Sequence, residues 1–318
     1  MMIKRMCLAA AAVLAAGSAQ AGDREVVIGA APTALHGSLT LPEGGLKSSA
    51  AVLLISGSGP TDRNSDSIVP GVKPASLRLL AEGLAVQGIA SLRFDKRGVA
   101  ASRGASGPER EVRFSTFVED AVAWGRLLAS QPGVKCVVIA GHSEGSLIGM
   151  LAAQRIPVCG YVSIAGAGRP IDVVMREQLA VQLPPETLKQ VDAIFAELKA
   201  GREVPGVPAT DPLFRPSIQP YLISWLPLDP AAEIRKVKAP VLILQGERDI
   251  QVAVVDAQAL AAARPDGRFA LLSGVSHVLK AAPADRAGNI ATYADPSLPL
   301  DPRVVDEIAA FTKAAPPR

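Results

Sequence analysis

The chain has 318 residues, of which 49% are hydrophobic and 20% charged, and its formal net charge is +3. It is long and apolar enough to bury a sizeable core, and too weakly charged to be a disordered chain. The near balance of 33 basic and 30 acidic residues argues against nucleic acid as the partner, because nucleic-acid binders normally show a clustered basic surface.

The first 21 residues have the pattern of a secretory signal. Lys4 and Arg5 precede the unbroken apolar run Met6–Ala16, and an Ala-Gln-Ala sequence follows that ends at Ala21. The run is too short for a stable membrane anchor, because a spanning helix needs about 18 apolar residues. We therefore expect cleavage after Ala21 and export, most simply to the periplasm, although the pattern does not separate a periplasmic protein from one released outside the cell.

Apolar strand segments alternate with segments of helical spacing along most of the chain. Glu25–Ile28 and Leu35–Leu41 are less regular and are expected to form an antiparallel edge pair. The later alternation predicts an α/β fold, with a mostly parallel central sheet covered by helices on both faces. The expected strands are Val52–Ser56, Ile89–Phe94, Val137–Ala140, Tyr161–Ile164, Val241–Leu244 and Phe269–Leu272, and the expected helices are Ala75–Val86, Phe117–Leu128, Leu147–Ala153, Val254–Ala263 and Pro302–Lys313.

One long segment interrupts this alternation. Residues 169–235 contain no good strand, and instead carry three helical pieces, 172–181, 185–199 and 219–225, joined by Pro-rich linkers. Such a length is too great for a plain connection between two strands. The pattern therefore predicts a helical lid at 169–235, inserted into a core that is formed by residues 22–168 and 236–318.

Two cysteines remain after the expected cleavage, and each opens an apolar strand. If the strands of Cys136 and Cys159 are parallel neighbours, the two Cα atoms lie about one strand spacing apart, roughly 5 Å. That distance lies within the range of a disulfide, which an exported protein can form. The alternative is a pair of buried free thiols that act as small hydrophobes.

The motif most suggestive of chemistry is Gly141-His142-Ser143-Glu144-Gly145, between a strand and a helix. A nucleophilic serine needs its oxygen held out of the sheet on a sharp turn, and flanking glycines let the neighbouring chain pass close to that turn. The helix that follows adds positive potential where an oxyanion would form. The motif predicts Ser143 as a nucleophile; the alternative is an ordinary strand-to-helix turn.

A serine nucleophile requires a base, and the chain has only three histidines. His142 is adjacent to Ser143 on the same turn, so its side chain should point elsewhere, and His36 lies in the N-terminal edge pair. His277 follows a predicted strand, where parallel strands place their active-site loops. We therefore expect His277 to be the base, and the alternative is a surface loop histidine.

The third member must accept a hydrogen bond from the imidazole and stabilise its positive charge. Asp249 lies in the loop after the strand Val241–Leu244 and is the expected acid, with Glu247 second and Asp256 third. The alternative for each is a solvated or helix-capping carboxylate. An oxyanion also needs two backbone donors, and we assign the N–H groups of Glu144 and of Ser58, which lies in a Gly-rich turn after a central strand.

No metal or organic cofactor is expected. Three histidines and two cysteines in the mature chain leave little from which to build a metal site. The expected partner is a small-molecule ester, and the oligomeric state is left open.

These residues together carry a family resemblance. The chain resembles serine hydrolases of the α/β-hydrolase fold over nearly all of its mature length, and is most similar to bacterial carboxylesterases. Two departures concern the pocket entrance: Ser56 stands where many relatives have a histidine, and Ala100 replaces a common glycine. The motifs are GSGPTDRN at 57–64, DKRG at 95–98, GHSEG at 141–145, a G-x-x-D-x-x-V loop at Gly246, Asp249 and Val252, and the stretch 293–300.

The resemblance implies hydrolysis of carboxylic esters with short to medium acyl groups through an acyl-enzyme, with Ser143, His277 and Asp249 as the catalytic residues. Two alternatives remain. A peptidase or amidase would use the same three residues, and the Glu144 carboxylate could then bind an amino group. A non-catalytic binding protein of the same fold is the other.

Several side chains are candidates for the substrate pocket, and each also has a structural interpretation. Phe214, Tyr221 and Trp225 of the expected lid could line an acyl pocket, although helical spacing of apolar residues more often reflects packing on the core. Arg63 and Arg97 could favour an acidic substrate at the pocket mouth. The favoured interpretation is that they pair with Asp62, Asp95 or nearby backbone carbonyls and hold the entrance loops.

Overall fold

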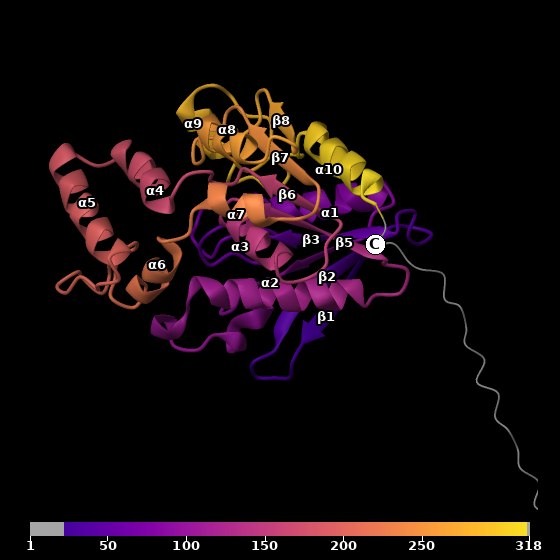
Figure 1. The fold of residues 1–318 in the computed structure, drawn as a ribbon, viewed down its shortest axis with the longest axis horizontal. Coiled ribbons are helices and arrows are strands. Elements are labelled where there is room, and N and C mark those ends of the chain that lie inside the picture. Colours follow the sequence, from indigo (N-terminus) through magenta and orange to yellow (C-terminus); the bar gives the residue numbers. More distant parts are fainter. Residues whose placement is uncertain (1–21, 317–318) are drawn as a thin grey trace, which may run out of the picture.

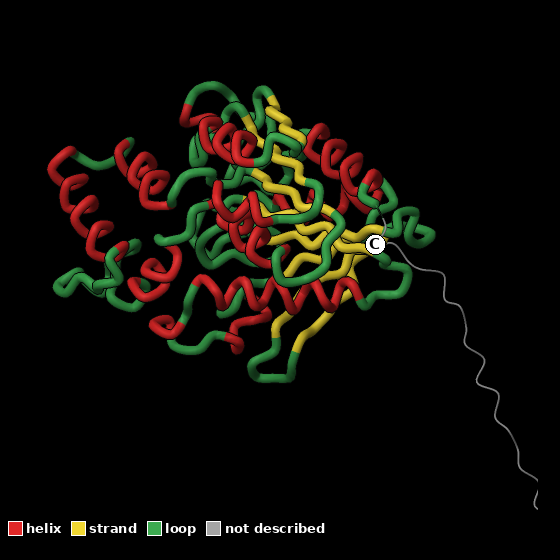
Figure 2. The backbone as a smooth tube through the Cα atoms, viewed as in Figure 1, coloured by secondary structure: helices red, strands yellow, loops and turns green. Residues whose placement is uncertain are grey.

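The computed structural model describes residues 22–316, so the expected signal sequence at 1–21 lies outside the described residues. The protein has an eight-stranded sheet in the order β1-β2-β4-β3-β5-β6-β7-β8. The strands run through the middle of the molecule, between helices (Figure 2). The expected antiparallel edge pair is confirmed as β1 and β2, and β3 to β8 are parallel to one another. The strands are β1 (Gly22–Ile28), β2 (Leu35–Leu41), β3 (Ala50–Ile55), β4 (Ser91–Phe94), β5 (Cys136–His142), β6 (Gly160–Ile164), β7 (Val241–Gly246) and β8 (Arg268–Leu272).

Helices bury both faces of this sheet, which explains why its central strands are apolar without a break. In β3, every residue is buried, and alternate side chains enter two separate cores. Residues of α2, α3 and α8 form the first core with Leu53, and residues of α1 and α10 form the second with Leu54. The helices are α1 (Ser76–Val86), α2 (Phe114–Ala129), α3 (Glu144–Ala153), α8 (Val254–Ala263) and α10 (Pro302–Ala314).

Residues 169–235, here called the helical insertion, lie between β6 and β7. Their helices α4 (Ile171–Ala180), α5 (Pro185–Lys199) and α6 (Gln219–Trp225) correspond to the three expected pieces, and they project to one side of the sheet (Figure 1). Four short helical elements were not predicted, because three to seven residues show too little periodicity. These are α7 (Pro230–Lys236), α9 (Arg286–Ala291) and the 3₁₀ turns η1 (Ala100–Ala105) and η2 (Glu109–Glu111).

Ion pairs tie the helical insertion to the core. At its start, the Arg169 guanidinium binds the buried carboxylate of Asp256 in α8, with Nη2 2.8 Å from Oδ2. At its far side, Arg110 pairs with Glu203 at 2.8 Å. Both contacts join segments far apart in the sequence and link the helical insertion to the core.

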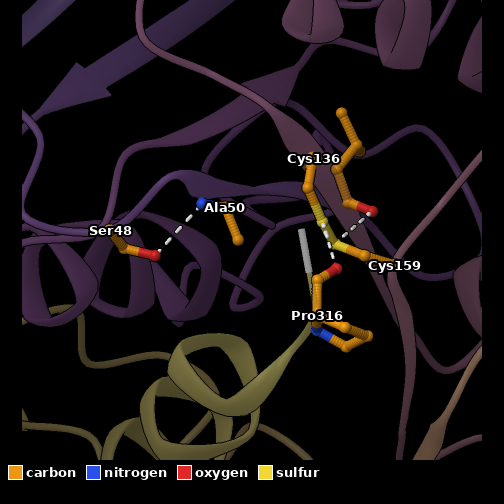
Figure 3. The surroundings of a disulfide bond; sticks show 6 residues. Ser48, Ala50, Cys136, Cys159 and Pro316 are labelled. Carbon is orange, nitrogen blue, oxygen red and sulfur yellow. Dashed lines mark hydrogen bonds between the residues drawn. A yellow bond between two sulfur atoms is a disulfide. The ribbon is translucent and has the colours of Figure 1, made fainter. Parts of the chain in front are cut away.

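A disulfide joins Cys136, the first residue of β5, to Cys159, which directly precedes β6 (Figure 3). The two Cα atoms are 5.8 Å apart, close to the separation expected for neighbouring parallel strands. The bond lies where β5 and β6 begin. This is the opposite end of the sheet from the carboxyl ends of the strands. Within residues 22–316, no helix has both the length and the apolar character that a membrane crossing requires.

Candidate active site

Ser143 occupies a sharp turn between β5 and α3. Its backbone angles, φ 56° and ψ −122°, are rarely adopted by a residue with a side chain. Both motif glycines are required by close packing: a Cβ on Gly141 would lie 2.0 Å from the carbonyl oxygen of Gly145, and one on Gly145 would lie 2.5 Å from that of Ile55. The sequence therefore folds locally into a strained turn that presents Ser143 at the carboxyl end of the sheet.

His277 and Asp249 form a buried pair in the loops that follow β8 and β7. The His277 Nδ1 lies 2.7 Å from Asp249 Oδ2, and the two side chains are 5% and 0% exposed. The other carboxylate oxygen accepts the backbone N–H groups of Gln251 at 2.8 Å and Val252 at 2.9 Å. This arrangement fixes the imidazole and leaves Nε2 as the nitrogen that can exchange a proton.

Ser143 and His277 both line a cavity of about 290 Å³, so the two predicted catalytic side chains face the same space. Among the described residues, no hydrogen bond joins Ser143 Oγ to His277 Nε2. Such contacts are often long until a substrate is bound.

The two other candidate acids have different partners. Glu247 is exposed and accepts hydrogen bonds from Ser273 Oγ and the Gly274 N–H. Asp256 is fully buried and binds Arg169 at the start of the helical insertion. Asp249 is therefore the carboxylate that contacts His277, as the chain order predicts.

His142 contacts His277 through a different group. Its Nε2 lies 2.8 Å from the backbone carbonyl oxygen of His277, to which it must donate, and the two ring centroids are 4.7 Å apart. Burial, with a smaller contribution from the neighbouring His277, lowers the pKa of His142 to about 3. His142 is therefore neutral near pH 7, where it holds the His277 backbone and is poorly suited to act as a base.

The turn after β3 lies beside Ser143, because β3 and β5 are parallel neighbours and Ile55 pairs with Gly141. A Cβ on Gly57 would lie 3.1 Å from the Ser143 Cβ. The N–H of Ser58 makes no backbone hydrogen bond within residues 22–316, and Glu144 opens α3, where a backbone N–H has no intrahelical acceptor. Both predicted oxyanion donors are thus placed beside the serine.

Two cavities meet at Ser143. The larger, of about 480 Å³, lies between the sheet edge and the helical insertion, and Ser58 and Glu144 also line it. The smaller is the 290 Å³ cavity that includes His277. Apolar side chains that line the larger cavity include Leu147, Ile171, Val174, Leu213, Leu222 and Trp225.

The comparisons with known proteins agree with this arrangement. The sequence model described as "Alpha/beta hydrolase family" matches residues 52–292, which is most of the chain. The chain belongs to this family.

Among curated proteins, the hydrolase is similar to "Esterase EstD" of Thermotoga maritima, with 28% identity over 298 residues. The alignment covers 87% of this chain and 65% of the relative, so this chain spans just under two thirds of the relative's length.

Solved structures share the fold at low identity. Est1E from Butyrivibrio proteoclasticus with bound ferulic acid has a TM-score of 0.61 and 19% identity, over 90% of this chain and 98% of that one. The esterase domain of a Rhodothermus marinus protein has a TM-score of 0.56 and 19% identity, over 92% and 98%.

Two of the three predicted aromatic pocket residues line a cavity, and the third does not. Tyr221 and Trp225 of α6 line the larger cavity of the hydrolase. Phe214 does not, because it packs edge-to-face against Phe195 of α5 with ring centroids 5.2 Å apart. Its role is packing within the helical insertion.

Arg63 and Arg97 lie outside both cavities, so the suggested contact with an acidic substrate does not fit their position. Arg63 binds the buried Asp95 through Nη2 at 2.7 Å and through Nε at 3.0 Å. Arg97 binds the buried Asp120 of α2 with Nε 2.6 Å from Oδ2. Both guanidiniums are engaged by buried carboxylates and brace the entrance loops, as the favoured interpretation predicts. Asp95 was among the expected partners of these arginines, whereas Asp120, which binds Arg97, was not.

The contacts of Lys96, which is only 4% exposed, were not predicted from the sequence. Its ammonium contacts the Gly57 carbonyl oxygen and the Glu144 carboxylate, next to the predicted oxyanion donors. The only signal in the sequence was its place in the DKRG motif, since a lysine is rarely buried unless it is paired. In the part of the chain that the structure describes, no cluster of three His, Cys, Asp or Glu side chains is arranged to hold a metal ion.

Proposed function

We propose that this hydrolase is an exported serine esterase that cleaves carboxylic esters with short to medium acyl groups. The observation that carries the proposal is the placement of Ser143 on its strained turn, beside the buried His277–Asp249 pair and at the junction of two cavities. The similarity to a curated esterase supports the same activity.

In the proposed reaction, Ser143 Oγ attacks the ester carbonyl carbon while His277 Nε2 takes its proton. Asp249 stabilises the imidazolium that forms. The N–H groups of Ser58 and Glu144 bind the carbonyl oxygen as it becomes an oxyanion. His277 then gives the proton to the leaving alkoxy oxygen. In the second half, it activates water to release the acid and regenerate the serine.

The two cavities suggest how the substrate is oriented. His277 must reach the leaving oxygen in order to protonate it, and His277 lines only the smaller of the two cavities. We therefore place the alcohol part of the ester in the 290 Å³ cavity and the acyl chain in the 480 Å³ cavity. The apolar lining of the larger cavity suits an aliphatic or aromatic acyl group.

The surroundings of Glu144 favour esters over substrates with a free amino group. One carboxylate oxygen lies 2.6 Å from Lys96 Nζ, and the other accepts the Tyr221 hydroxyl at 2.5 Å. Both oxygens are thus already bound by the protein, and the side chain is only 3% exposed. It is poorly placed to recognise the α-amino group of a peptide.

The decisive experiment uses p-nitrophenyl butyrate with the wild type and Ser143→Ala, together with intact mass after treatment with a fluorophosphonate. We expect ester hydrolysis and a single adduct on the wild type, and neither on the variant. A folded wild type that shows neither hydrolysis nor adduct would support the non-catalytic binding protein. An adduct without ester turnover would move the assignment to amides, which aminoacyl anilides would then test.

Export rests on residues 1–21 and is tested separately. Expression of the full chain in a Gram-negative host, followed by fractionation and N-terminal sequencing, should give a periplasmic protein that begins at Gly22. A cytoplasmic protein that retains Lys4 and Arg5 would contradict this part of the proposal.

A further inference from the structure

A buried ammonium lies directly behind the proposed oxyanion hole. Lys96 Nζ is 2.5 Å from the carbonyl oxygen of Gly57 and 2.6 Å from Glu144 Oε2, and it lies 5.1 Å from the centre of the Phe117 ring. The Lys96 and Glu144 side chains are 4% and 3% exposed. Because both groups are buried, water screens their attraction little.

The carbonyl that Lys96 binds belongs to the same peptide unit as the Ser58 N–H. A peptide unit is planar and trans, so its C=O and N–H point in opposite directions. An ammonium that holds the Gly57 oxygen on one side therefore sets the direction of the Ser58 N–H on the other. A charged donor on the oxygen also polarises the unit and strengthens the N–H as a donor.

The Lys96 ammonium is held in turn by residues from two other elements. Glu144, at the start of α3, binds both Lys96 and the hydroxyl of Tyr221 in the helical insertion. The Tyr221 ring packs on Phe117, with ring centroids 5.8 Å apart. Burial, and secondarily the Glu144 charge, raises the pKa of the Tyr221 hydroxyl well above its usual value, so it remains a donor.

We propose that Lys96 is a positioning residue of the oxyanion hole. It holds the Gly57–Ser58 peptide so that the Ser58 N–H faces the reacting carbonyl oxygen, and the contacts of Glu144 and Tyr221 hold the ammonium in place. The inference rests on the proposed function. In this proposal, the DKRG loop, the helix after the serine and the helical insertion together orient the Ser58 N–H.

Loss of the Lys96 contact should weaken binding of the transition state more than binding of the substrate. Deleting one oxyanion donor lowers kcat by about 100- to 1000-fold. Releasing the Gly57 carbonyl misaligns the Ser58 donor without deleting it. We therefore expect kcat to fall by about 10- to 100-fold with KM changed by less than about threefold, because the ground-state ester needs this donor less than the oxyanion does.

The test variant is Lys96→Met combined with Glu144→Gln, because removing the lysine alone would leave an unpaired buried carboxylate. The matched control is Arg97→Met combined with Asp120→Asn. That pair is also formed between the DKRG motif and a buried carboxylate, with Arg97 Nε 2.6 Å from Asp120 Oδ2, but it lies outside both cavities. We expect the control to keep the kcat of the wild type.

The readout that isolates the oxyanion is a pair of inhibitors, n-butyl trifluoromethyl ketone and n-butyl methyl ketone. Ser143 Oγ adds to the activated trifluoromethyl ketone, its proton passes to His277, and the carbonyl electron pair becomes an oxyanion. The methyl ketone remains a neutral carbonyl. We expect the inhibition constant of the trifluoromethyl ketone to rise by the same factor as kcat/KM falls, and that of the methyl ketone to stay within about twofold.

An unchanged kcat in the Lys96/Glu144 variant, an equal fall in the Arg97/Asp120 variant, or equal weakening of both ketones would overturn the proposal. If the first variant does not fold, Tyr221→Phe removes only the outermost contact. It should lower kcat about threefold, with the same selectivity between the ketones, and an unchanged kcat would again count against Lys96. An inactive wild type would refute the proposed esterase itself, which separates the two failures.

Discussion

His142 should make the stability of the fold depend on pH. Its pKa is about 3 in the folded protein, mainly because the ring is buried and secondarily because His277 is close. In the unfolded chain, the pKa returns to about 6.5. Between about pH 6.5 and pH 3, His142 binds a proton in the unfolded chain but stays neutral in the folded protein. The contribution to stability is therefore complete above pH 6.5 and is lost as the pH falls toward 3.

The size of the effect follows from the two pKa values. The whole difference corresponds to about 5 kcal/mol of unfolding free energy, lost over the full window. Between pH 7 and pH 5, the folded state stays almost entirely neutral at His142, and the loss is about 2 kcal/mol. That is a large part of the 5 to 15 kcal/mol that stabilises a typical domain.

The assay is urea unfolding at pH 7 and pH 5, with the wild type and His142→Gln. Glutamine keeps an N–H that can reach the His277 carbonyl oxygen, but it does not titrate. Other titratable groups contribute equally to both proteins. We therefore expect the wild type to lose about 2 kcal/mol more than the variant. Equal losses in the two proteins would refute the reasoning, because they would mean that His142 is not kept neutral by the fold.

Three further predictions concern the site and the core. Asp249→Asn should lower kcat for p-nitrophenyl butyrate by about 10⁴, while Glu247→Gln leaves it unchanged; similar effects would mean that the acid is misassigned. The double variant Cys136→Ala and Cys159→Ala should unfold about 3 kcal/mol more easily in urea than the oxidised wild type, because the bridge closes a loop with a sequence separation of 23. Equal midpoints would exclude a stabilising bridge. Trp225→Ala should enlarge the 480 Å³ cavity and raise kcat/KM for longer p-nitrophenyl esters relative to the butyrate by about tenfold. An unchanged preference would place the acyl chain elsewhere.

Much of the architecture could be predicted from the sequence, because it depends on local patterns. The strand β3 is apolar at every position because both faces of a central parallel strand are buried, and that burial is observed. The G-x-S-x-G motif indicated the turn at Ser143, since its glycines are needed for backbone approach at short range. His277 followed from elimination among three histidines.

Other features depend on contacts between segments far apart in the chain. Pairing of Arg63 and Arg97 with nearby aspartates was the favoured prediction, but only the fold shows that Arg97 binds Asp120, which lies 23 residues further along the chain. Phe214 and Trp225 have similar apolar character in the sequence, yet one packs inside the helical insertion and the other lines a cavity.

The strands, the longer helices and the serine, histidine and aspartate at the strand ends could be predicted from the sequence, because periodicity and turn chemistry act over a few residues. The meeting of Lys96, Glu144 and Tyr221 behind the Gly57–Ser58 peptide could not be predicted, because it depends on the folded arrangement. A buried ammonium takes its role from the groups that surround it. Those groups come from three parts of the chain that only the folded protein brings together.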